Sequence, residues 1–460
     1  MSHVTFANLD LPSALLENLT GMGYTEMTPI QAATLPKILQ GHDVIGQGKT
    51  GSGKTAAFAL GILAKLQVKR FRVQSLVLCP TRELADQVAG EIRKLARSIH
   101  NIKVLTLCGG VPFGPQLGSL EHGAHIIVGT PGRVEEHLTK GSLKLTDLTT
   151  LVLDEADRML EMGFQPTLDA ILAFAPKSRQ TLLFSATYPK QIADLAARLM
   201  NAPSLIQVES QHSDQSIQQQ FFAVGSNSER LQAVQLLLKA YQPVSSVVFC
   251  NTRKETQEVA DALADAGFSV LALHGDLDQR DRDQTLVRFA SKSVSVLVAT
   301  DVAARGLDID ALDAVINYQL AHDVDTHTHR IGRTGRAGSS GLACSLFSPQ
   351  DGYKIALLED QLAAPITPTA LPELSLLNKV PNQPPMTTLW IDAGKRQKLR
   401  AGDVLGALTA DQQLSRDHIG KISLFDDWSY VAVRSDILQI ALQMFQQGIK
   451  GRFIRVKVVS

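Results

Sequence analysis

The stretch that most constrains the fold is residues 44–55, VIGQGKTGSGKT. Two apolar residues lead into a glycine-rich loop ending in Gly53-Lys54-Thr55, and an apolar, alanine-rich run, 56–66, follows. This order predicts a strand, a loop and a helix, and the loop matches the Gly-x-x-x-x-Gly-Lys-Thr pattern. Glycines leave backbone N–H groups open to phosphate oxygens, and a helix N-terminus favours the same anion. The stretch therefore predicts a nucleoside triphosphate site.

A pair of carboxylates supports this site. Asp154 and Glu155 follow the apolar run 151–153, where a phosphate-loop enzyme places its acidic metal ligand. We expect Asp154 and the Thr55 hydroxyl to hold Mg²⁺, partly through water, while Lys54 contacts the β- and γ-phosphates. Glu155 can orient or deprotonate the attacking water. A solvated acidic turn is the simpler alternative, but the two motifs explain each other.

Short apolar runs rich in β-branched residues alternate with helix-like segments through the first 350 residues. Runs that are apolar on both faces suit a parallel sheet, so the pattern predicts two doubly wound α/β domains in tandem. We place the first domain at residues 1–209 and the second at 217–363, joined by the polar stretch 210–216. The expected strands are 76–79, 104–107, 126–128, 151–153, 181–184, 247–250, 270–273, 294–299, 314–317 and 343–347.

A third segment follows a proline-rich stretch, 364–385, which predicts a linker. Its pattern predicts strand 389–392, helix 404–412, strands 419–425 and 429–433, helix 436–447 and strand 453–459. This βαββαβ order is typical of RNA-recognition (RRM-like) α+β domains, although ferredoxin-like folds share it. We therefore expect a small third domain at 386–460.

Charge separates this third domain from the rest of the chain. The whole chain is neutral, but residues 386–460 contain 11 Lys+Arg against 7 Asp+Glu, so the remainder is net acidic. A basic module on a neutral protein indicates a nucleic-acid partner. Trp428 and Tyr430 are two residues apart and share one strand face, where they either stack on bases or fill the core. The candidate phosphate contacts are Lys395, Arg396, Lys398, Arg400, Lys421, Arg452, Arg455 and Lys457.

Composition excludes several other classes of protein. The longest apolar run, 56–64, is much shorter than the roughly 20 residues that span a bilayer, and the N-terminus does not resemble a secretory signal. The four cysteines are scattered and do not form a metal-ligand pattern. We expect a cytoplasmic protein without a membrane partner or a structural metal.

The motifs of the first 350 residues resemble, in order, those of the DEAD-box RNA helicase family, which has two RecA-like domains. The resemblance implies that the Phe6 ring stacks on adenine, that Gln31 hydrogen-bonds the base, and that Asp308 contacts the ribose. The phosphate loop is then Gly51, Ser52, Gly53, Lys54 and Thr55. His329 belongs to the catalytic motif HRIGRTGR, whose Arg333 and Arg336 act as arginine fingers on the γ-phosphate. The segment that couples hydrolysis to strand separation is Ser185, Ala186 and Thr187.

The same resemblance implies contacts to the RNA backbone from both domains. These residues are Thr81, Arg82, Gly110, Thr130, Arg133, Arg253, Gly275, Gln279, Arg282 and Thr300. Two positions depart from the family pattern: Gly48 replaces an alanine, and His327 replaces an aromatic residue, usually tyrosine.

The C-terminal segment has a likeness of its own. Its stretches 398–407, 419–422 and 430–433 resemble the RNA-binding domain of the bacterial DEAD-box protein A family. That resemblance implies a role in large ribosomal subunit assembly, on pre-50S particles, with a 23S ribosomal RNA hairpin near the peptidyl-transferase centre as target. The stretch 426–433, DDWSYVAV, differs from the usual recognition-sheet pattern.

We therefore expect an ATP- and Mg²⁺-dependent RNA helicase whose tail directs it to ribosomal RNA. Three alternatives use the same residues: a DNA translocase, a non-enzymatic RNA scaffold, and a general RNA chaperone whose tail does not prefer one target.

Overall fold

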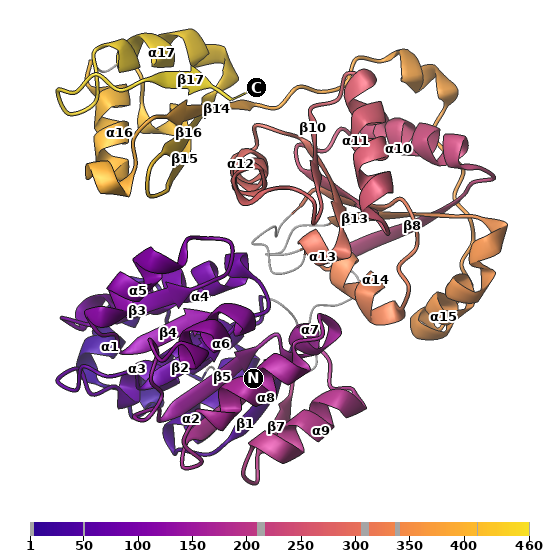
Figure 1. The fold of residues 1–460 in the computed structure, drawn as a ribbon. Coiled ribbons are helices and arrows are strands. Elements are labelled where there is room, and N and C mark those ends of the chain that lie inside the picture. Colours follow the sequence, from indigo (N-terminus) through magenta and orange to yellow (C-terminus); the bar gives the residue numbers. More distant parts are fainter. Residues whose placement is uncertain are drawn as a thin grey trace. The chain divides into compact units, whose positions relative to one another are not determined.

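The computed structural model describes residues 4–48, 51–208, 217–304, 312–335, 341–411 and 413–459. They form two compact units, one up to residue 208 and one from residue 217 onward. The first contains an α/β domain, and the second contains another α/β domain and a smaller C-terminal domain (Figure 1). None of the described helices combines the length and the apolar character needed to cross a membrane.

The first unit is a seven-stranded parallel sheet in the order β3-β4-β2-β5-β6-β1-β7. Its strands are β1 (Val44–Gln47), β2 (Ser75–Leu78), β3 (Val104–Leu107), β4 (Ile126–Gly129), β5 (Thr150–Asp154), β6 (Gln180–Ser185) and β7 (Ser204–Gln207). Its helices are α1 (Ser13–Gly21), α2 (Pro29–Leu39), α3 (Lys54–Lys65), α4 (Arg82–Leu95), α5 (Phe113–Glu121), α6 (Pro131–Thr139), α7 (Ala156–Glu161), α8 (Gln165–Ala173) and α9 (Lys190–Leu199).

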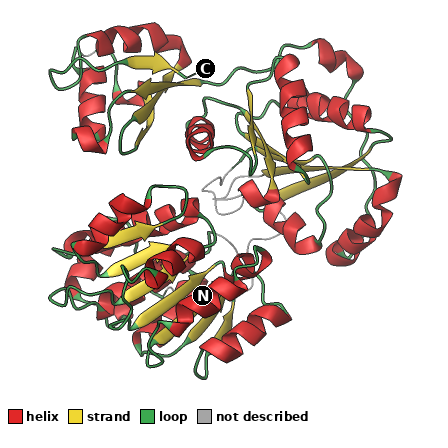
Figure 2. Cartoon of the chain, viewed as in Figure 1, coloured by secondary structure: helices red, strands yellow, loops and turns green. Residues whose placement is uncertain are grey.

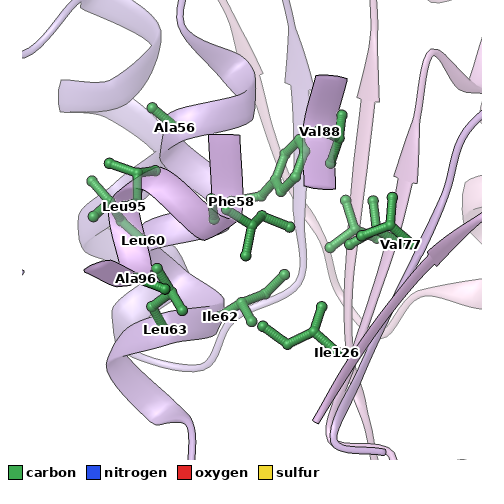
Figure 3. Packing of buried hydrophobic residues seen from close by; sticks show 14 of the residues in the cluster. Ala56, Phe58, Leu60, Ile62, Leu63, Val77, Val88, Leu95, Ala96 and Ile126 are labelled. Atoms are coloured by element: carbon green, nitrogen blue, oxygen red, sulfur yellow. The ribbon is translucent and has the colours of Figure 1, made fainter. Parts of the chain in front are cut away.

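This sheet is buried on both faces, as the runs of apolar residues predict. Successive residues of a strand point to opposite faces, so Val77 packs in one core cluster and Leu76 and Leu78 in another. The first cluster includes Phe58 of α3 and Val88 of α4, which pack over β2 and β4 (Figure 3). The phosphate-loop helix α3 is therefore anchored by its own apolar residues.

The second unit begins with a six-stranded parallel sheet in the order β10-β11-β9-β12-β13-β8. Its strands are β8 (Ile217–Ala223), β9 (Ser246–Cys250), β10 (Val270–Leu273), β11 (Val296–Thr300), β12 (Ala314–Asn317) and β13 (Gly341–Phe347). Its helices are α10 (Asn227–Tyr241), α11 (Arg253–Asp265), α12 (Gln279–Ala290), α13 (Asp301–Ala304), α14 (Val324–Ile331) and α15 (Gly352–Leu362). Helices lie on both sides of the sheet (Figure 2).

All ten strands predicted in the two α/β domains are present, and the fold class is confirmed. The sequence analysis did not find β7 and β8. Both are edge strands with an alternating or polar sequence, so they do not show the continuous apolar run of an inner strand. The connection predicted at 210–216 lies outside the described residues.

The C-terminal domain is an antiparallel sheet in the order β15-β16-β14-β17, with the predicted βαββαβ order. Its elements are β14 (Met386–Ile391), α16 (Ala401–Thr409), β15 (Ile419–Leu424), β16 (Ser429–Arg434), α17 (Leu438–Gln446) and β17 (Val456–Val458). Residues of both helices pack with one sheet face in a single core cluster. β17 begins at Val456, three residues later than predicted, and a tight turn precedes it around Gly451.

The proline-rich stretch 364–385 is attached to the second α/β domain. The N–H of Thr369 donates to the carbonyl of Phe221 on the edge strand β8 (2.7 Å), and Lys239 Nζ donates to the carbonyl of Leu377 (2.6 Å). Leu371 packs against the core of that domain. The stretch therefore occupies part of an edge that would otherwise present unpaired backbone groups.

The sheet face of the C-terminal domain that lies opposite its helices contacts α12 and the residues just after it. Thr388 Oγ1 and Ser293 Oγ are hydrogen-bonded (2.6 Å), and the Tyr430 hydroxyl donates to Gln284 Oε1 (3.4 Å). The Arg280 guanidinium lies 5.3 Å from the Trp428 ring centroid. Tyr430 is buried, at 1% exposure. The contact with α12 therefore accounts for Trp428 and Tyr430 on this sheet face better than base stacking or packing in the domain's own core does.

Candidate active site and RNA-binding strand ends

The phosphate loop and the predicted adenine-reading glutamine form one hydrogen-bonded unit. Gln31 accepts from the N–H of Thr28 in a capping box on α2, and its Nε2 donates to the Gly53 carbonyl (3.1 Å). Gly53 has φ 96°, and a Cβ there would lie 2.5 Å from Gln31 Nε2, so only glycine fits. Lys54 opens α3, is buried, and donates through Nζ to the Gly48 carbonyl.

The Phe6 side chain is buried within the first domain. Its ring is 2% exposed and packs in the hydrophobic core, edge-on to Tyr24 at a centroid distance of 6.3 Å. The stacking of Phe6 on adenine stays a prediction. In this structure Phe6 is a core residue that anchors the N-terminal segment.

Asp154 and Glu155 lie at the carboxyl end of the central strand β5. Burial, and next the neighbouring Glu155 carboxylate, raise the pKa of Asp154 to about 7, while Lys54 acts in the opposite direction. Glu155 has φ 51° and ψ 54°, a left-handed conformation that costs a non-glycine residue about 1–2 kcal/mol. A buried carboxylate beside a strained acidic residue is typical of a catalytic site that receives a cation.

The segment Ser185-Ala186-Thr187 is held from two sides. On one side, Asp157 Oδ2 accepts from the N–H groups of Ala186 (3.2 Å) and Thr187 (3.0 Å) and from Thr187 Oγ1 (2.9 Å). On the other side, the N–H of Gly48 in the phosphate loop donates to the Ser185 carbonyl (3.1 Å). The segment is therefore hydrogen-bonded to both the acidic motif and the phosphate loop.

The predicted RNA-binding residues of the first domain lie at the ends of three neighbouring strands, β3, β4 and β2. Thr81 caps α4 after β2. Thr130 precedes α6 after β4, and its hydroxyl accepts from the N–H of Gly109 (3.4 Å). Gly110 has φ 69°, and a Cβ there would lie 1.8 Å from Arg82 Nη2. The Arg82 guanidinium therefore lies directly over the glycine.

A residue that the sequence analysis missed holds Arg133 in place. Buried Gln116 accepts from Arg133 Nη1 (2.9 Å), contacts His137 Nε2 (3.2 Å) and donates to the Cys108 carbonyl (3.0 Å). Arg133 also donates to the Val111 carbonyl and pairs with Glu136. No sequence signal links Gln116 to an arginine 17 positions away, because only the fold brings α5 and α6 together.

The second domain repeats this arrangement at β10, β11 and β9. Arg253 Nε lies 3.4 Å from the position of a Cβ on Gly275, and Arg253 pairs with Asp276 (2.6 Å). Thr300 ends β11 and accepts from the N–H of Ala303 (3.3 Å). Gln279 and Arg282 lie on α12, and Arg282 donates to the Ala303 carbonyl (2.9 Å).

Arg330 is a second residue whose importance the sequence did not indicate. It is buried and donates to both oxygens of Asp301 (2.6 and 2.7 Å), to Asn251 Oδ1 (2.8 Å) and to the Gln319 carbonyl (2.7 Å). It therefore ties α14, which carries His329, to the ends of β9 and β11. Arg333 follows α14 and is buried, at 7% exposure. Asp308 and Arg336 lie outside the described residues.

The predicted basic residues of the C-terminal domain fall into two groups, with Lys421 apart from both. Lys395, Arg396, Lys398 and Arg400 follow β14, and Arg452 joins them by donating to the Gln397 carbonyl (3.4 Å). Arg455 and Lys457 lie along the edge strand β17, whereas Lys421 lies on β15 at the opposite edge. The structure therefore does not bring Lys421 together with the others.

Comparison with known proteins agrees with this geometry. Residues 28–195 match the model of the DEAD/DEAH box helicase family, 229–338 the helicase conserved C-terminal domain, and 388–458 the DbpA RNA binding domain. The chain is 53% identical to the ATP-dependent RNA helicase DbpA of Escherichia coli K12, over 98% of both chains. It belongs to the DEAD-box RNA helicases.

Two other DEAD-box helicases extend the comparison. CshA of Geobacillus kaustophilus is 43% identical over 75% of this chain and 74% of its own. The solved structure of S. cerevisiae Dbp5 bound to RNA and ADP BeF3 is 28% identical, with a TM-score of 0.71 over 82% of this chain and all of that chain. As a DEAD-box helicase, this chain is an RNA-dependent ATPase that uses ATP.

Proposed function

We propose that this DEAD-box helicase opens short RNA duplexes in 23S ribosomal RNA during assembly of the large ribosomal subunit, on pre-50S particles in the cytoplasm. The observation that carries the helicase mechanism is the segment Ser185-Ala186-Thr187, hydrogen-bonded to the phosphate loop through Gly48 and to the acidic motif through Asp157. The DbpA-type domain at 388–458 supports ribosomal RNA as the target.

In the proposed mechanism, Lys54 leaves the Gly48 carbonyl and binds the β- and γ-phosphates, while Glu155 orients the attacking water. Arg333 and Arg336 stabilise the charge of the transferring phosphoryl group, with His329 in the same motif and Asp308 on the ribose. Both domains must close for these groups to act together. The bound RNA backbone then lies on the strand-end residues of both sheets, and the bending of one strand separates it from its partner.

Magnesium fits this site. The buried Asp154 carboxylate, with its pKa raised by burial and by Glu155, favours a nearby cation, and Thr55 on α3 supplies a hydroxyl oxygen. When bound, Mg²⁺ neutralises charge on the β- and γ-phosphates. Glu155 orients the attacking water, and Lys54 holds the β- and γ-phosphates.

The test is ATPase activity of the full chain with a 23S ribosomal RNA fragment that contains the hairpin near the peptidyl-transferase centre. Random RNA and single-stranded DNA of equal length are assayed beside it. We expect the ribosomal fragment to stimulate most and DNA not to stimulate. Equal stimulation by both RNAs would favour a general RNA chaperone, preference for DNA would favour a translocase, and no ATPase under any condition would favour a scaffold.

A further inference from the structure

The segment after α17 presents an exposed aromatic side chain among cations. Ile449 and Arg452 exchange two backbone hydrogen bonds (2.9 and 3.0 Å) around Lys450 and Gly451, whose φ angles are 55° and 69°. Two left-handed residues between two hydrogen-bonded residues are typical of a type I′ turn, which sets the direction of the outgoing chain. Phe453 follows this turn and is 88% exposed, the highest value among the large apolar side chains of the described chain.

Phe453 belongs to a row of side chains on the sheet face away from the helices. Ile454 and Val456 pack against the domain core, so Phe453, Arg455 and Lys457 point to the other side. The ladder with β14 extends to this row, because the N–H of Asp392 donates to the Arg455 carbonyl (3.0 Å). Exposed and half-buried side chains alternate from residue 453 into β17, so the row offers three contacts on one side.

This edge differs from the rest of its sheet face. Thr388, Tyr430 and Trp428 contact the region of α12, whereas Phe453, Arg455 and Lys457 are all exposed. Lys457 Nζ lies 5.1 Å from the Trp390 ring centroid, which holds the ammonium group beside β14.

The charges of this edge favour an anion. Within the described part of the chain, Arg396 and Lys450 have carboxylate partners at 3.0 Å, but Arg455 and Lys457 do not form a salt bridge. Asp392 lies opposite Arg455 in the ladder. A phosphate group can therefore approach both cations without displacing an ion pair.

We propose that Phe453 stacks on an unpaired RNA base and that Arg455 and Lys457 bind the neighbouring phosphates. The inference rests on the proposed function, because it gives the RNA-binding domain a nucleotide site. A base presents a flat π face to the ring and carries its anionic backbone at a fixed distance, which matches an aromatic residue followed by two cations. An apolar protein partner would use Phe453 but would not need the two cations.

The test uses the full chain and two fluorescently labelled RNAs, the ribosomal hairpin fragment and a random RNA of equal length, with 2-aminopurine in place of one unpaired adenine. Phe453→Ala should weaken binding about 5- to 100-fold and abolish the quenching that stacking causes. Phe453→Trp should retain both. Arg455→Gln and Lys457→Gln should each reduce the dependence of log affinity on log salt by about one, whereas Phe453→Ala should leave that slope unchanged.

Tyr353→Ala is the matched control, because Tyr353 on α15 is 77% exposed and lies outside the RNA-binding domain. It should leave affinity and quenching unchanged. Wild-type affinity in Phe453→Ala or in the apolar, non-aromatic Phe453→Leu would overturn the stacking role alone. Failure of the unsubstituted chain to bind either RNA would overturn the proposed function itself, which separates the two failures.

Discussion

The two parallel sheets have the same strand order but different residues at their ends. The order β3-β4-β2-β5-β6-β1 of the first domain corresponds strand by strand to β10-β11-β9-β12-β13-β8 of the second. After the first three strands, both domains place a Thr-Arg pair, a glycine and another threonine: Thr81-Arg82, Gly110 and Thr130 in one, Thr252-Arg253, Gly275 and Thr300 in the other. The predicted RNA contacts thus follow a shared framework.

The domains diverge at the next strand. Leu78 pairs with Leu153 in the first sheet and Phe249 with Asn317 in the second, and each of Leu78 and Phe249 lies three residues before a Thr-Arg pair. By this register Glu155 corresponds to Gln319, which donates to Glu255 (2.6 Å) and accepts from the N–H of Asn251 (3.0 Å). The first domain therefore has the predicted catalytic acid at the position where the second domain has an amide that holds neighbouring groups.

The largest expected effect comes from giving the first domain the residue of the second. Glu155→Gln should lower kcat for ATP by about 10²- to 10⁴-fold, because the amide cannot take a proton from water. ATP affinity, measured with a fluorescent nucleotide, should remain. Gln319→Glu, the reverse exchange, should not restore turnover to Glu155→Gln. Full ATPase activity in Glu155→Gln would remove this residue from the mechanism.

The second domain contains both a buried ion pair, formed by Arg330, and an exposed ion pair, formed by Arg253. Arg330→Met should destabilise the second domain by about 3–5 kcal/mol, because Asp301 loses its partner at a largely buried position. Arg253→Met should cost at most about 1 kcal/mol, since Arg253 and Asp276 have side chains 64% and 61% exposed. Hydrogen exchange of β9 and β11 measures both. Equal protection in the two variants would contradict the role of Arg330 as a hub.

His327 should make the second domain sensitive to acid. Burial, and next Arg330, lower its pKa to about 4, whereas an unfolded histidine has a pKa of about 6.5. The unfolded state therefore binds more protons between these values, so the stabilisation is complete above pH 6.5 and is lost as pH falls toward 4. Urea unfolding should show about 2 kcal/mol less stability from this group at pH 5 than at pH 7. His327→Gln should reduce that difference, and an unchanged pH dependence would exclude His327 as its source.

The smallest expected effect concerns Gly110 and Gly275, the two glycines that lie beside Arg82 and Arg253. Gly110→Ala should cost about 1–2 kcal/mol of stability and raise the KM for RNA, since φ is 69° and the methyl group would displace Arg82. Gly275→Ala should be nearly neutral, because its nearest contact would be Arg253 Nε at 3.4 Å. RNA-stimulated ATPase and thermal unfolding check both variants. Equal losses of stability and RNA-stimulated activity would show that the two glycines hold their arginines in equivalent ways.

The sequence alone determined the fold class and the residues at the strand ends. Short runs of apolar residues that alternate with helix-like segments are typical of inner parallel strands, and a phosphate-binding loop needs its glycines and lysine in one continuous stretch. Local patterns of this kind can be recognised in the sequence without the tertiary structure. They predicted Lys54, Asp154 and Glu155 in their strand and loop contexts, and the βαββαβ order of the C-terminal domain.

The tertiary structure decided which side chains are buried and which partners they have. Phe6 packs in a core cluster, Tyr430 hydrogen-bonds Gln284, and Arg330 connects three elements. All of these contacts join residues that are distant in the sequence. The exposure of Phe453 likewise depends on the turn before it and on the alternation of side chains from residue 453 into β17. The burial of a side chain and its hydrogen-bond partners depend on packing between elements. A pattern along the chain does not specify that packing.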